Sequence, residues 1–121
     1  MILRRCLSAV AFAVLILLPV VAQAVNPFRR SGFNLTDSDV DILTETTRPF
    51  FDDDTIPIGT AKTWTNPQSG NGGTATLINR FDQKGMPCRR IQHDIKLKNM
   101  ADPFRFIIDR CRIADGTWKM L

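Results

Sequence analysis

The cysteines constrain the fold of this chain more than any other residues. There are three, Cys6, Cys88 and Cys111. Cys6 lies in an N-terminal segment with the pattern of a cleavable signal, so only Cys88 and Cys111 would remain after export. An even number of cysteines in a small exported domain indicates a disulfide, with two free thiols as the alternative. The bridge would close a loop of about 24 residues and stabilise the domain by roughly 3 kcal/mol.

The N-terminal segment has the three parts of a secretory signal. Arg4 and Arg5 precede an apolar stretch that ends near Val21, and Ala22-Gln23-Ala24 offers small residues for cleavage. We predict a signal peptide over residues 1–24, and an uncleaved anchor is the alternative. The apolar stretch is barely long enough to span about 30 Å of hydrocarbon and contains Pro19. We therefore expect no membrane segment after cleavage and an exported location that is periplasmic, outer-membrane-associated or secreted.

The remainder of the chain is long enough for one domain. Residues 25–34 are polar, contain Pro27 and Gly32, and are expected to form a flexible leader. Residues 35–121 would then fold as a single unit. Loss of Arg4 and Arg5 lowers the formal net charge from +4 to +2. Arginines and acids are interspersed rather than segregated, so we expect no nucleic-acid partner.

The cysteine pair also predicts a strand register. If residues 89–97 and 104–112 form an antiparallel hairpin, placing Cys88 opposite Cys111 sets every other pair. One face then pairs Arg90 with Asp109, Gln92 with Ile107 and Asp94 with Arg105, and the other pairs Ile91 with Ile108, His93 with Phe106 and Ile95 with Phe104. Charge pairs and apolar pairs result from one constraint, as expected of a correct register.

The predicted fold class is α+β, with one short N-terminal helix packed on a four- to five-stranded antiparallel sheet and one disulfide. Thr36 can cap a helix from about 37 to 47, which Arg48-Pro49 would end. The strands are expected near residues 58–65, 74–81, 89–98, 104–113 and 117–121. Asp115-Gly116 favours a type I′ turn that pairs Ile113 with Trp118. The apolar pattern shifts between Ile108 and Cys111, which indicates a bulge or burial of both faces.

The segment from Trp64 to Gly73 is the candidate binding loop. Its sequence predicts an irregular turn between strands, and the strand-like residues that follow do not fit a phosphate-binding loop. The candidate ligand residues are Trp64, Asn66, Pro67, Gly70 and Asn71. A buried Trp64 and Trp118 would belong to the core, whereas an exposed indole beside the glycines would favour a ligand site.

No pattern indicates catalysis, a cofactor or a metal. Ser69 is a possible nucleophile, but Asp94 would point to the opposite face of its strand from His93 and could not orient it. The acids at 52–54 and at 37, 39 and 41 are better explained as turn and helix-start residues than as calcium ligands. We therefore assign no catalytic or metal residues, and a hydrolase is only a weak alternative.

Three ordered motifs resemble one protein family. They are W-T-N-P-Q-S-G-N-G-G at 64–73, G-M-P-C-R-R at 85–90 and C-R-I-A-D-G-T-W at 111–118. They are similar to the C-terminal domain of the rickettsial-type 17 kDa surface antigen family, whose members are envelope or outer-membrane-associated and often lipoproteins with a glycine zipper. This chain has neither a lipobox cysteine nor a glycine zipper. The resemblance supports the Cys88–Cys111 pairing and turn roles for Asn66, Gly70 and Gly116.

The expected function is a non-catalytic exported envelope protein with a structural or interaction role. The alternative is a periplasmic binding module that recognises a peptide, a cell-wall glycan or another envelope protein through the loop at 64–73 or a sheet edge. The sequence leaves the oligomeric state open.

Overall fold

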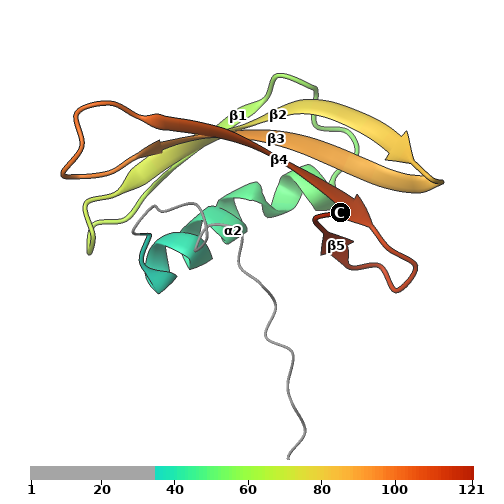
Figure 1. Cartoon of the computed structure of the whole chain (residues 1–121), viewed down its shortest axis with the longest axis horizontal. Helices are drawn as coiled ribbons and strands as arrows, with labels where there is room; N and C mark the ends of the chain where they lie inside the picture. Colours follow the sequence, from blue (N-terminus) through green and yellow to red (C-terminus); the bar gives the residue numbers. More distant parts are fainter. Residues whose placement is uncertain (1–34) are drawn as a thin grey trace, which may run out of the picture.

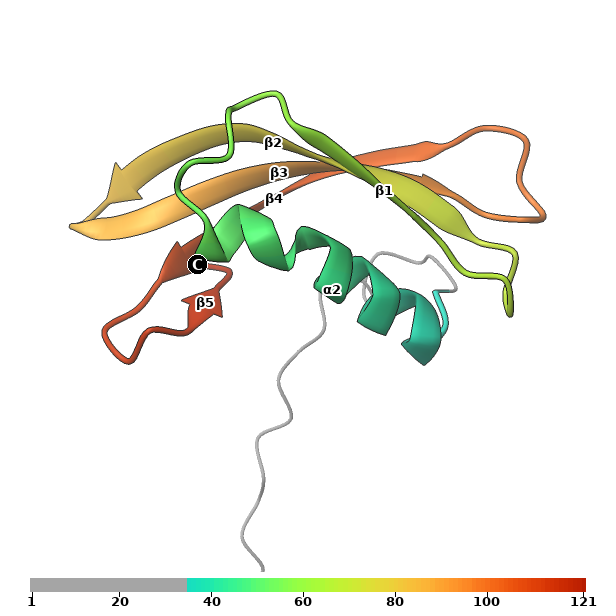
Figure 2. The ribbon, with the colours of Figure 1, turned by 180° about the vertical axis from the view of Figure 1, so that it is seen from behind.

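One helix lies across one face of a five-stranded antiparallel sheet (Figure 1; Figure 2 shows the reverse view). The computed structural model describes residues 35–121, so the predicted signal peptide and leader lie outside the described residues. The elements are α2 (Asp37–Asp52), β1 (Ala61–Thr65), β2 (Gly72–Gln83), β3 (Met86–Lys96), β4 (Phe104–Arg112) and β5 (Trp118–Lys119). The strand order is β1-β2-β3-β4-β5. The predicted α+β class is confirmed.

Helix α2 begins at the predicted cap but is longer than predicted. The side chain of Thr36 accepts a hydrogen bond from the Asp39 N–H at 3.0 Å, and the Asp39 carboxylate accepts the Thr36 N–H at 2.9 Å. The predicted end near residue 47 is wrong, because the helix continues through Pro49. An internal proline costs about 3 kcal/mol. Phe50 is fully covered, and its burial stabilises the longer helix by about 1.5–3 kcal/mol. The Asp53 N–H also donates a hydrogen bond to the Pro49 carbonyl in the last turn.

The predicted register of β3 and β4 is confirmed at every pair. Cys88 lies opposite Cys111 in a disulfide, and the register continues without a break to Ile95 opposite Phe104. Both predicted charge pairs form, Arg90 with Asp109 through two hydrogen bonds of 2.8 Å and Arg105 with Asp94 at 2.7 Å. The shift between Ile108 and Cys111 is not a bulge: Ile108 is buried on the helix side and Cys111 on the opposite face, although Ile107 on that second face is exposed.

The turns of the sheet differ from the prediction. The pairing of Ile113 with Trp118 is wrong by one residue, because Arg112 pairs with Trp118 and the Ile113 N–H donates to the Thr117 carbonyl. A type I′ turn needs a positive φ at both central residues, but only Gly116, with φ +88°, has one. The Asp115 carboxylate instead accepts the Thr117 N–H, and the connection is a three-residue loop. The two-residue turn with positive φ at both positions is at Lys84-Gly85, between β2 and β3.

The first and last residues of several strands also differ from the predicted ones. β2 extends to residue 83 and β3 begins at 86, while β1 begins at 61 rather than 58. The register irregularity of the sheet is in β2, between Leu77 and Asn79.

The core lies between α2 and the sheet in two clusters. One joins Leu43 of the helix with Trp64, Ile95 and Ile108, and the other joins Phe50 with Ala75, Leu77 and Ile91. Gly73 is needed opposite Trp64, since a Cβ there would lie 2.8 Å from the indole Nε1.

Reduction of the Cys88–Cys111 disulfide is expected to lower the free energy of unfolding by about 3 kcal/mol, because it releases a loop closed between two strands. Urea unfolding of the oxidised protein with and without dithiothreitol measures the loss. The double variant Cys88→Ala/Cys111→Ala is the control, and reductant should not change its midpoint. Equal midpoints for the oxidised and reduced wild type would contradict the prediction.

Candidate functional site

Trp64, the aromatic residue of the predicted binding loop, belongs to the core. Its side chain is only 3% exposed and packs with Leu43 and Ile95. Trp118 is half-buried and lies in β5, away from the loop at 64–73. Neither indole therefore forms a surface platform beside the glycines.

The polar side chains of the loop converge on a buried carboxylate. Asp39 is fully covered, and its oxygens accept hydrogen bonds from Asn66 Nδ2 at 2.7 Å, Ser69 Oγ at 2.6 Å and Asn71 Nδ2 at 2.8 Å. The Thr36 N–H is the fourth donor. The motif at 64–73 thus binds the first turn of α2, a partner that lies 27 to 32 positions earlier in the chain.

The backbone of the loop is arranged to make these contacts. The Asn66 N–H donates to the Asn71 carbonyl, and the Gly70 N–H donates to the Asn66 carbonyl, both at 2.8 Å. Gly70 has φ +75°, as expected of its predicted turn role. Pro67 and Gly70 are exposed, and a ligand-binding role for the loop stays a prediction.

The environment of Asp39 favours its charged form. Burial alone would raise the pKa of this carboxyl, but the hydrogen bonds from Ser69, Asn71, Thr36 and Asn66 outweigh that effect and lower the pKa to about 2. The charged carboxylate of Asp39, which accepts these four hydrogen bonds, therefore joins the loop to the helix.

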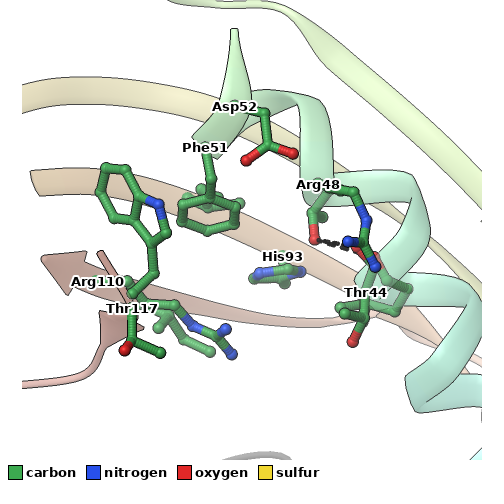
Figure 3. Close-up of a pocket in the computed structure, with 12 residues that line it drawn as sticks. Thr44, Arg48, Phe51, Asp52, His93, Arg110 and Thr117 are labelled. Carbon is green, nitrogen blue, oxygen red and sulfur yellow. Dashed lines mark hydrogen bonds between the residues drawn. The ribbon is translucent and has the colours of Figure 1, made fainter. Parts of the chain in front are cut away.

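A pocket of about 370 Å³ lies at the other end of the helix. It is bounded by α2, by the helix-facing sides of β3 and β4, and by the β4–β5 connection. Figure 3 shows His93 near the middle of the lining, with Phe51, Asp52 and Arg48 above it and Arg110 and Thr117 below it. The lining residues are Leu43, Thr44, Thr47, Arg48, Phe51, Asp52, Ile91, His93, Ile108, Arg110, Thr117 and Trp118.

Arg110 supplies the cation on the sheet side of the pocket. It is half-buried, and its guanidinium lies 5.9 Å from the centre of the Phe51 ring. Among residues 35–121, the four ion pairs engage other arginines, and none engages Arg110. Burial lowers the pKa of Arg110. A desolvated cation without a carboxylate partner is an attractive site for an external anion.

His93 forms a neutral part of the pocket floor. It is 4% exposed and stacks on Phe106 with ring centres 5.2 Å apart. Burial and the nearby charge of Arg110 lower the pKa of His93 to about 4, against a smaller raising effect of Asp94. The imidazole is therefore uncharged at neutral pH.

Trp118 forms the end wall of the pocket next to the helix terminus. Its ring lies 5.1 Å from that of Phe51, and the guanidiniums of Arg89 and Arg112 lie 5.1 and 5.8 Å from the Trp118 ring centre. Arg89 also donates to the Phe50 carbonyl at 3.2 Å and to Asp54 at 2.5 Å. This cluster holds the C-terminal end of α2 against the sheet.

This pocket was not predicted from the sequence. The signal was present in the predicted register, because Arg110 follows Phe106 and Ile108 at the same two-residue spacing and so places a charge on the apolar face. Among residues 35–121, no three metal-ligating side chains come together, and no helix is long and apolar enough to cross a bilayer.

Replacement of Asp39 by Asn is expected to lower the free energy of unfolding by about 2 kcal/mol at pH 7, the equivalent of lowering a pKa from 3.8 to about 2. Because the folded pKa is depressed, this stabilisation is present above pH 4 and disappears as the pH falls toward 2. Urea unfolding of both proteins over that range measures it, with Asp41→Asn on the exposed side of α2 as the control. A wild-type-to-variant difference that does not change with pH would refute the assignment.

Wild-type protein is also expected to lose about 3 kcal/mol of stability between pH 6.5 and pH 4 through His93, because the unfolded state takes up a proton that the folded state resists. His93→Phe keeps the stacking on Phe106 and removes the titration. The unfolding free energy of wild type should therefore fall more steeply than that of the variant across this window. Parallel curves would show that His93 does not titrate as described.

The described fold and its motifs can be compared with known proteins. Residues 53–119 match the family described as 17 kDa outer membrane surface antigen. No curated protein and no solved structure matches the chain. The matched range begins directly after α2 and contains all three motifs that suggested the resemblance. Since it covers more than half of the chain, this protein belongs to the 17 kDa outer membrane surface antigen family.

Proposed function

We propose that this chain is a non-catalytic, exported protein of the cell envelope that binds another envelope protein through the pocket between α2, the sheet and β5. The observation that carries the proposal is Arg110, a half-buried cation that lines the pocket next to apolar and aromatic side chains and makes no ion pair with the described residues. Ligand sites commonly combine such walls with a few polar groups that fix orientation. A purely structural domain gains nothing from a desolvated charge without a partner.

Several contacts favour a binding role over catalysis. The Ser69 hydroxyl donates to Asp39 rather than to a base. Asp94 is engaged by Arg105 on the face of the sheet opposite His93. A serine hydrolase needs its nucleophile, histidine and acid in one hydrogen-bonded series. Ser69, His93 and Asp94 do not form such a series.

Two features support an exported, envelope-associated location. The disulfide suits an oxidising compartment, and the family to which the chain belongs is named for the outer membrane surface. The predicted signal peptide over residues 1–24 agrees with both. We place the protein in the periplasm or on the outer membrane rather than in the medium.

The loop at 64–73 is the second candidate for the binding surface, but it receives less support. Asn66 and Asn71, the polar residues proposed as ligands, are occupied by Asp39. The pocket instead presents a cation that makes no ion pair with the residues from 35 to 121.

A photo-crosslinking amino acid placed in living cells tests the proposal. At Thr44, an exposed residue on the rim of the pocket, it should give discrete adducts with an envelope protein. The matched control is Thr63, which is also exposed but lies on the face of the sheet opposite the helix. Arg110→Gln should reduce the Thr44 adducts.

Three results would overturn the proposal. They are equal adducts from both positions, no adduct from Thr44, or an adduct formed only within the chain itself, for example with residues 25–34.

A further inference from the structure

Strand β4 has an open edge beside the pocket. β5 pairs with β4 only at Cys111 and Arg112. Within residues 35–121, no strand pairs with the outer edge of β4 from residue 104 to residue 110. Met120 and Leu121, which follow β5, belong to no strand and are exposed. β4 is thus the outer strand of the described sheet over most of its length, as its ribbon shows in Figure 1.

The register identifies which backbone groups this edge offers. Cys88 and Cys111 have Cα atoms 4.0 Å apart, the close spacing of a pair that does not exchange backbone hydrogen bonds. Such pairs alternate along an antiparallel ladder, so Arg105, Ile107 and Asp109 also turn their N–H and C=O groups away from β3. The edge thus presents alternating donors and acceptors at three residues.

Charged residues often block an open edge, but here their side chains are held elsewhere. Arg105 is bonded to Asp94, and Asp109 to Arg90, so both charges lie over β3. The backbone edge between them is accessible. An extended polypeptide satisfies such an edge by adding a strand.

The side chains next to the edge define what that strand would carry. Ile108 and Arg110 point to the helix side and line the pocket. α2 lies closest to β1 and β2, and the pocket lies over the part of β3 and β4 that Ile91, His93, Ile108 and Arg110 provide. On an added strand, a residue directly opposite Arg110 would point to the helix side of the sheet, as Arg110 does. The residue two positions away on that strand would lie opposite Ile108 and point to the same side. Charge complementarity selects an acid for the first position and an apolar side chain for the second.

We infer that an extended peptide segment of an envelope partner adds as a strand along the β4 edge, with an acidic side chain at Arg110 and an apolar one at Ile108. This inference rests on the proposed function and names its ligand. A lipid could place an acid at Arg110, but it has no backbone donors and acceptors for the open edge. The peptide uses both the edge and the pocket.

Selection of displayed random linear peptides on the purified protein tests this inference. Enriched sequences should share an acidic residue two positions from an apolar one. Binding of a synthetic consensus peptide should weaken about tenfold in Arg110→Gln, because a charge-assisted hydrogen bond is lost. It should be unchanged in the matched variant Arg80→Gln, since Arg80 lies on β2 and does not line the pocket. Thermal unfolding checks that both variants are folded.

Backbone methylation of the peptide provides the decisive readout. N-methyl groups at alternate positions should abolish binding, and those between them should have little effect, because only every second amide faces β4. Binding should also slow hydrogen exchange at Arg105, Ile107 and Asp109.

Failure of this inference is distinguishable from failure of the proposed function. A selection that yields no Arg110-dependent peptide, or equal tolerance of methylation at every position, would overturn the peptide assignment. Arg110-dependent binding to phosphatidylglycerol vesicles without peptide binding would overturn it as well. In each case the Thr44 adducts report separately on whether the pocket has a protein partner.

Discussion

The pairing of Cys88 with Cys111 is the constraint on which the rest of the domain depends. Side chains alternate across a strand, so a slip of one residue would move every helix-facing side chain of β4 to the opposite face. With the disulfide in place, Ile91 and His93 of β3 and Ile108 and Arg110 of β4 all face α2. The apolar surface for the helix and the cation of the pocket thus result from the same covalent pairing.

The family motifs hold the helix at its two ends. The polar residues of the motif at 64–73 bind the buried carboxylate of Asp39 in the first turn, while Arg89 and Trp118, from the other two motifs, pack around the last turn at Phe50 and Phe51. The helix lies closest to β1 and β2 between these contacts. The pocket lies between the second half of the helix and part of β3 and β4, with Trp118 at its end, so the anchors of the fold also shape the candidate site.

Much of the sheet could be predicted from the sequence, because the single pair Cys88–Cys111 sets the register of every other pair in the β3–β4 hairpin. The extension of α2 beyond Pro49 could not, since it depends on the burial of Phe50 against strands that form later in the chain. Similarly, the segment that contains Asn66 and Ser69 was recognisable as a turn, but the common partner of these two residues, Asp39, is distant in the sequence. The shift at Asp115 reflects a local side-chain bond that competes with the type I′ turn. Arg110 had the right spacing to face the helix, yet only the assembled fold shows that no carboxylate among residues 35–121 meets it.

The buried charge of Asp39 and the half-buried charge of Arg110 have opposite surroundings, and this difference is informative. Asp39 receives four hydrogen bonds, which more than compensate for its loss of water and lower its pKa. Arg110 loses part of its water as well, but among the described residues its guanidinium lies over the Phe51 ring and makes no ion pair. An uncompensated buried charge opposes folding, whereas an apolar residue at the same position would not. In the proposed complex, a carboxylate of the partner would offset the free energy that Arg110 costs the isolated domain, and the β4 edge would offer the partner backbone hydrogen bonds.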